Sequence, residues 1–98
     1  MKHSEALFKL QSHAADLRAL GVEALYLFGS TVRDEARADS DVDIFFDYAE
    51  DRPFSLLDLA AVSRVISGYL GQEADVMTRG SLHPALKDDI TRTALRVF

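Results

Sequence analysis

The sequence predicts an α/β (α+β) protein in which about four helices pack on a small sheet of three or more strands. Its 98 residues suit one domain with one hydrophobic core, spanning residues 1–98. The composition is 48% hydrophobic and 28% charged, as is usual for a globular chain. Stretches with helical spacing of apolar residues alternate with short runs of β-forming residues, which favours helices packed on a sheet.

The first half of the chain is predicted to begin with one long helix. Ser4 can cap this helix, and Gly21 follows as a stop signal. Its apolar residues recur at helical spacing: Leu7, Leu10, Ala14, Leu17 and Leu20. Residues 24–28 are few and rich in β-forming side chains, which predicts a buried strand. Gly29 and Ser30 end that strand, and residues 31–37 predict a short helix of about two turns.

Residues 41–47, DVDIFFD, predict a half-buried strand with an acidic side. Strict alternation assigns its residues to two faces: Val42, Ile44 and Phe46 on one, and Asp41, Asp43, Phe45 and Asp47 on the other. The acidic residues Asp47, Glu50 and Asp51 are interpreted as a solvated loop that follows the strand.

The second half of the chain is predicted to hold two helices and a strand. Ser55 and Asp58 form a capping-box pattern for a helix that Gly71 closes. Residues 73–77 predict a third strand, and Pro84 suits the first turn of a last helix. The final residues 95–98 fit either the end of that helix or a short edge strand.

Charge and cysteine content exclude several classes of function. Eleven Lys and Arg against 16 Asp and Glu give a net charge of −5, so direct nucleic-acid binding is not expected. A single nucleotide held through metal ions is still compatible with this charge. The chain has no cysteine, which removes disulfides, thiolate zinc sites and cysteine nucleophiles. Its start lacks a signal-peptide pattern and no apolar run approaches membrane length, so we expect a cytoplasmic protein.

Three aspartates are candidate metal ligands. Asp41 and Asp43 lie two apart on a strand, so both project from one face about 6.6 Å apart at the backbone. Oxygen ligands of this kind suit Mg²⁺ or Mn²⁺ better than zinc. Asp75 lies within the apolar third strand, where a carboxylate needs a partner or a metal. The alternatives are a solvated strand face for the pair and, for Asp75, a salt bridge to Arg79 or another arginine.

The segment after the first strand is a candidate phosphate-binding turn. Gly29 lets a ligand approach the backbone closely, and a helix start offers unpaired N–H groups to phosphate oxygens. Ser30 adds a hydroxyl donor and Arg33 a cation one turn further on. The alternative is an ordinary strand-to-helix turn with Ser30 as the N-cap.

The segment GSTVRDEARADSDVDIFF resembles the signature of the nucleotidyltransferase fold shared with DNA polymerase beta, in its minimal single-domain form. That pattern is Gly-Ser, ten residues, then Asp-x-Asp, and residues 31–40 are the ten. The resemblance implies a small mixed sheet, a triphosphate held by Gly29 and Ser30, and catalytic metal ligands at Asp41, Asp43 and Asp75. Arg33 matches a common nucleotide-binding position, although Asp34 follows it where the family often has glycine.

The same resemblance implies a function. Minimal members of the family use two Mg²⁺ ions to transfer AMP from ATP to a tyrosine of a HEPN-type helical toxin, and so act as antitoxins. An apolar set at the end of the chain is a candidate docking surface: Leu86, Ile90, Leu95 and Phe98. The alternatives are a binding module that neutralises a partner by occlusion and a regulatory domain that binds nucleotide.

Overall fold

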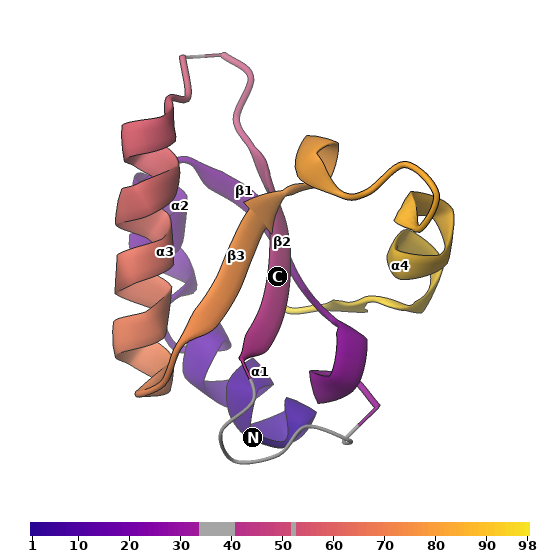
Figure 1. Ribbon diagram of the computed structural model, residues 1–98. Helices are drawn as coiled ribbons and strands as arrows, with labels where there is room; N and C mark the ends of the chain where they lie inside the picture. Colours follow the sequence, from indigo (N-terminus) through magenta and orange to yellow (C-terminus); the bar gives the residue numbers. More distant parts are fainter. Residues whose placement is uncertain (34–40, 52) are drawn as a thin grey trace.

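Four strands form one mixed sheet in the order β3-β2-β1-β4 (Figure 1). The structure is a computed structural model that describes residues 1–33, 41–51 and 53–98. β1 (Val22–Phe28) runs antiparallel to β2 (Val42–Tyr48) and to β4 (Leu95–Arg96). β3 (Ala74–Thr78) runs parallel to β2. The predicted mixed sheet is therefore confirmed, and the undecided end of the chain is an edge strand.

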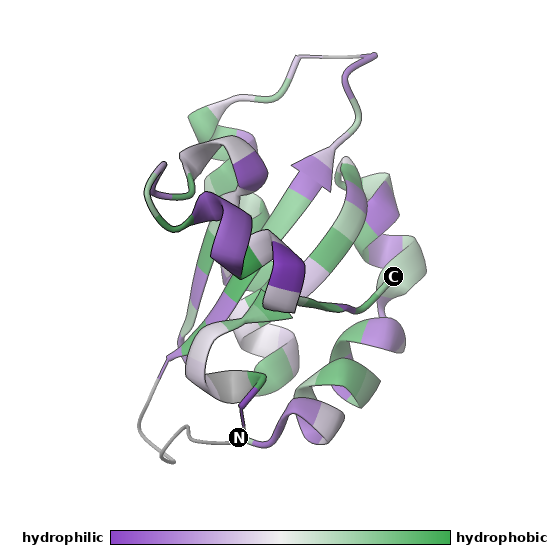
Figure 2. Ribbon diagram, turned by 90° about the vertical axis from the view of Figure 1, so that its right-hand side faces the viewer, coloured by the Kyte–Doolittle hydropathy of each residue, from purple (hydrophilic) through white to green (hydrophobic). Residues whose placement is uncertain are grey.

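Three helices cover one face of the sheet, which we call the core face. They are α1 (His3–Gln11), α2 (Ala14–Ala19) and α3 (Leu56–Leu70), while α4 (Lys87–Thr93) lies on the other side (Figure 1). The core joins buried side chains of these three helices and the sheet: Ala6, Leu10, Leu17, Val22, Leu25, Leu27, Val42, Ile44, Phe46, Val62, Ile66 and Leu70. Figure 2 shows the contrast, with a largely hydrophilic α4 in front of mostly hydrophobic strands.

The longest helix begins and ends as the sequence predicts. Ser55 Oγ accepts from the Asp58 N–H at 3.2 Å, and Asp58 Oδ2 accepts from the Ser55 N–H at 2.8 Å. Gly71 closes α3 in the left-handed region, with φ +72°. α3 is the crossover connection that parallel pairing of β2 and β3 requires.

The prediction of a single long helix from Ser4 is wrong, because helical geometry is interrupted at residues 12–13 and two helices, α1 and α2, form instead. Ser12 Oγ donates to the carbonyl of Phe8 at 2.8 Å, a bond that bends helices. His13 leaves helical geometry (φ −114°, ψ 19°), and its ring stacks on Tyr69 of α3 at 3.6 Å. Ser4 lies inside α1, whose N-cap is Lys2.

Two other predicted helices differ from the structure. Gly29–Thr31 form a 3-10 turn, and residues 34–37 of the short helix predicted over 31–37 lie outside the described residues. The last helix begins at Lys87, after Pro84, because His83 Nδ1 first accepts from the Ala85 N–H at 3.1 Å and holds a separate turn. In the part of the chain that the structure describes, no helix is both long and apolar enough to span a bilayer.

Candidate active site

The strand register brings the predicted phosphate turn and two of the three aspartates together. On β1, Phe28 lies opposite Asp43, and on the other side of β2 Asp43 lies opposite Asp75. Gly29 directly follows Phe28, and Asp41 directly precedes β2. These residues lie at one end of the sheet, on the face opposite the core, which we call the site face.

Asp43 lies at the electrostatic centre of this cluster. Its pKa is raised above the ordinary value of 3.8, mainly by burial and then by the negative charges of Asp75 and Asp41. The Arg33 guanidinium acts in the opposite direction and lowers the same pKa. Asp41, Asp75 and Arg33 are thus each close enough to Asp43 to change its pKa, although the four residues come from three separate stretches of chain.

Gly29 is needed for a reason that the sequence alone did not indicate. Its φ is +72°, in the left-handed region. A Cβ atom at this position would overlap Asp43 Oδ2 and lie 3.3 Å from Asp43 Cγ. The glycine therefore lets the end of β1 approach the Asp43 carboxylate, and any larger residue would displace that carboxylate.

Ser30 and Arg33 lie on the turn that follows Gly29. Ser30 is half-buried and does not cap a helix, because the N-cap of the 3-10 turn is Phe28 and no side chain caps it. The alternative reading of Ser30 as an ordinary N-cap is therefore wrong. Arg33 is exposed. The remainder of the ten-residue spacer, residues 34–40, lies outside the described residues.

Asp75 is exposed, so the expectation of a carboxylate embedded in an apolar strand is wrong. Of the alternative salt bridges, the one to Arg79 is wrong, because Arg79 binds Asp47 instead. Arg79 Nε donates to Asp47 Oδ1 at 2.7 Å and Nη2 to Oδ2 at 3.0 Å. Asp47 is a residue of β2 and is paired with Arg79, so it does not belong to a solvated loop. Asp75 lies opposite Asp43 in the strand register.

An aromatic layer separates the two ends of the site face. Tyr26 lies opposite Phe45, which lies opposite Met77, and the rings of Tyr26 and Phe45 stack at 4.8 Å. The Arg79 guanidinium lies 5.1 Å from both ring centroids. The hydrogen bonds from Arg79 to Asp47 raise the pKa of Arg79 and fix its side chain, so the guanidinium stays charged and in place. The sequence reasoning missed this layer and the ion pair, although the period-two pattern of Asp43, Phe45 and Asp47 was visible.

The donor chemistry of the carboxylate cluster fits a hard divalent cation. Asp41, Asp43 and Asp75 supply only oxygen ligands, which Mg²⁺ and Mn²⁺ prefer. Their mutual repulsion, which adds to the effect of burial in raising the pKa of Asp43, is what a cation would cancel. Within residues 1–33, 41–51 and 53–98, no three His, Cys, Asp or Glu side chains already converge on one point.

The sequence matches a known family over most of its length. Residues 10–97 match the family described as "Nucleotidyltransferase domain". The chain is 40% identical over 88 residues to the protein adenylyltransferase MntA of Thermococcus cleftensis, covering 89% of this chain and 83% of that protein.

Solved structures show the same fold. A structure described as a putative minimal nucleotidyltransferase superposes with a TM-score of 0.81 and 29% identity, covering 97% of this chain and 95% of that one. An MNT antitoxin in complex with a tri-AMPylated HEPN toxin of Shewanella oneidensis superposes with a TM-score of 0.62 and 16% identity, covering 90% and 68%. The first likeness confirms the predicted fold class, and the second concerns the fold alone.

Proposed function

Because this chain belongs to the nucleotidyltransferase domain family, we propose that it transfers AMP from ATP to a hydroxyl group of a partner protein. The observation that carries the proposal is the approach of the Gly29 turn to Asp43, with Asp75 in register beside it. A phosphate-binding turn and a carboxylate cluster must meet in this way for a triphosphate to bridge them.

The described residues have distinct roles in this reaction. The Ser30 hydroxyl and the Arg33 guanidinium bind the β and γ phosphates, which orients the α phosphorus toward the acceptor. The acceptor oxygen forms a bond to the α phosphorus, and the bond from that phosphorus to the bridging oxygen of the β phosphate breaks. Pyrophosphate leaves with that electron pair. Asp75, exposed beside Asp43, accepts the proton of the hydroxyl.

Asp41, Asp43 and Asp75 are the residues that would hold divalent metal ions. Mg²⁺ bound there would neutralise phosphate charge and lower the pKa of the acceptor hydroxyl. Without metal, three like charges would repel the triphosphate, so we propose that nucleotide binding depends on Mg²⁺ or Mn²⁺.

We further propose that the acceptor is a tyrosine of a HEPN-type toxin. Two relatives support a protein acceptor: the MntA relative is a protein adenylyltransferase, and the MNT neighbour is in complex with an AMPylated HEPN toxin. The chain would then act as an antitoxin by modifying its partner.

The test uses the purified chain, a co-expressed HEPN-type protein, Mg²⁺ and ATP labelled at its α-phosphate. We expect covalent label on the partner and, by mass spectrometry, AMP on a tyrosine. Asp43→Asn should abolish the label, whereas Glu5→Gln, which removes an exposed charge on α1, on the other side of the sheet from the site face, should not. A stable complex that never takes up label would overturn the proposal in favour of neutralisation by occlusion. Metal-dependent ATP binding without complex or label would instead indicate a regulatory domain.

A further inference from the structure

We propose that the acceptor binds as an extended segment along the site face, with a Lys or Arg four residues from the modified hydroxyl. That cationic side chain would occupy a cavity at the far end of β2. The inference rests on the proposed function and names the class of segment that the site accepts.

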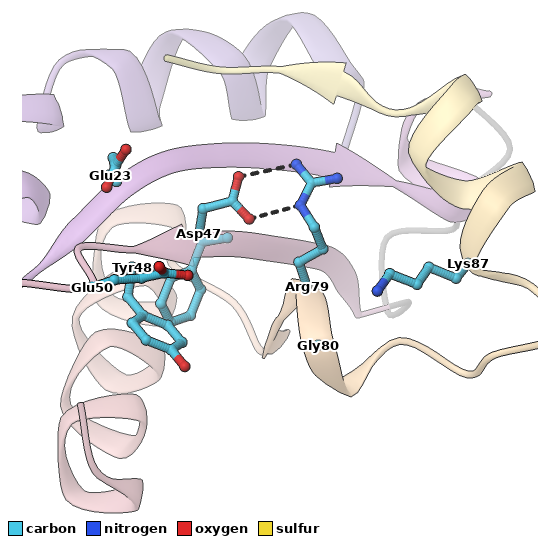
Figure 3. A pocket seen from close by; sticks show the side chains of 8 residues that line it. Glu23, Asp47, Tyr48, Glu50, Arg79, Gly80 and Lys87 are labelled. Atoms are coloured by element: carbon cyan, nitrogen blue, oxygen red, sulfur yellow. Dashed lines mark hydrogen bonds and ion pairs between the residues drawn. The ribbon is translucent and has the colours of Figure 1, made fainter. Parts of the chain in front are cut away.

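The cavity has a volume of about 550 Å³ and lies at the end of β2 remote from Asp43. Its walls come from three parts of the chain: Glu23 on β1, Asp47 and Tyr48 on β2 with Glu50 just after it, and Arg79 with Lys87 from the β3 to α4 region (Figure 3). Asp47, which lines the cavity, shares the site face with Asp43, and Arg79 of the same cavity lies over the Phe45 ring, so the cavity and Asp43 lie on the same side of the sheet.

A β-bulge turns Glu23 toward this cavity. The β1–β2 register shifts between Val22 and Ala24, so Val22 pairs with Tyr48 and stays in the core. With strict alternation, Glu23 would share the core face with Leu25. The bulge instead leaves Glu23 exposed, and bulges of this kind commonly re-aim a side chain next to a functional site.

The charges of the cavity favour a cation at its outer end. Arg79 and Asp47 neutralise each other through two hydrogen bonds. Glu23 and Glu50 both lie on one side of that pair and Lys87 lies on the other (Figure 3). Among the described residues, neither glutamate forms an ion pair, so both carboxylates are available. The net charge of −5 acts in the same direction, since it attracts basic partners.

The spacing follows from strand geometry. Asp43 and Asp47 are four residues apart on one strand and project from the same face, about 13 Å apart at roughly 3.3 Å per residue. An extended segment lying along β2 advances by the same rise. Residues four apart in that segment both face the sheet, whereas residues three or five apart face opposite sides.

The test uses synthetic peptides with one tyrosine and one lysine placed three, four or five residues away, on either side. Each peptide carries a fluorophore, so binding to the wild-type chain is measured by anisotropy without ATP, and AMP transfer is measured separately with Mg²⁺ and ATP. We expect the four-residue spacing to bind about threefold to tenfold more tightly than the others, and the preference to weaken at high salt. Glutamate in place of that lysine should remove the advantage.

Glu23→Gln and Glu50→Gln together should abolish the preference for the four-residue spacing. Glu5→Gln is the matched control and should retain it, and unchanged thermal melting of all variants would show that they fold. Equal binding and equal AMP transfer for every spacing would overturn the inference and leave the proposed function intact. A glutamate-dependent preference in binding, with no AMP transferred to any peptide or partner, would support the cavity's role and overturn the proposed function.

Discussion

Replacing Asp43 by Asn separates the charge of the site from its shape. The amide keeps the side-chain volume but removes the carboxylate. The pKa of that carboxylate is raised by burial and by the charges of Asp75 and Asp41. In metal-free buffer at neutral pH, the variant should be at least as stable as the parent. Because the group is partly exposed, solvent screening limits the gain to a few tenths up to about 1 kcal/mol. One kcal/mol corresponds to about 4–8 °C in the melting temperature of a domain of this size.

The pH dependence has a defined sign. Asp43 has a folded-state pKa above its ordinary value of 3.8, so the folded protein binds its proton more tightly than the unfolded chain does. The parent therefore loses stability as the pH rises from 3.8 through the folded-state pKa. The advantage of Asp43→Asn should be absent well below pH 3.8 and complete at neutral pH. Thermal melts of the parent and of Asp43→Asn in EDTA across this pH range measure that difference in stability.

Ligand addition gives the larger and more decisive effect. A Mg²⁺–ATP concentration of about 100 times its dissociation constant should stabilise the parent by about 2.7 kcal/mol. That is roughly 11–22 °C in melting temperature at the conversion above. Asp43→Asn should lose most of this shift, and Glu5→Gln should keep it. Equal shifts in the parent and in Asp43→Asn, measured by differential scanning fluorimetry, would refute the assignment of Asp43 as a metal ligand.

Three further outcomes are expected. Ser30→Ala should weaken Mg²⁺–ATP binding in calorimetric titration while leaving the melting temperature almost unchanged, because Ser30 caps no helix. Gly29→Ala should cost more stability than Gly71→Ala, where φ is also +72° and a Cβ meets open space; the shared φ accounts for about 1–2 kcal/mol of each loss. Equal losses would show that the overlap with Asp43 relaxes freely. AMP transfer should require Mg²⁺ or Mn²⁺, with zinc a poor substitute, and activity in excess EDTA would exclude metal dependence.

The register explains why only part of the site was visible in the sequence. The Gly29–Ser30 and Asp41–Asp43 pairs together form the family signature, so the resemblance implied that they share one site. Asp75 carried no local motif, and its place beside Asp43 follows from the parallel pairing of β2 with β3. The Arg79–Asp47 pair joins residues 32 apart in sequence and replaces the Asp75–Arg79 bridge that proximity suggested.

Short sequence patterns correctly predicted the structural features that depend only on residues close together in the chain. The capping box of Ser55 and Asp58, the left-handed Gly71 and the alternation along β2 each depend on neighbours within a few residues, and each was predicted correctly. The family signature belongs to the same class, because it is a spacing between two short motifs.

Only the tertiary structure decided the features that depend on distant partners. Leu95 and Arg96 are a strand because they pair with β1, and Leu25 also exchanges backbone hydrogen bonds with Val97 and Phe98; local propensity does not encode that pairing. The bulge that exposes Glu23 exists because Val22 is buried in the core opposite β2. Strand register and core packing are collective, so a carboxylate's neighbours, and with them its pKa, emerge only when the sheet is assembled.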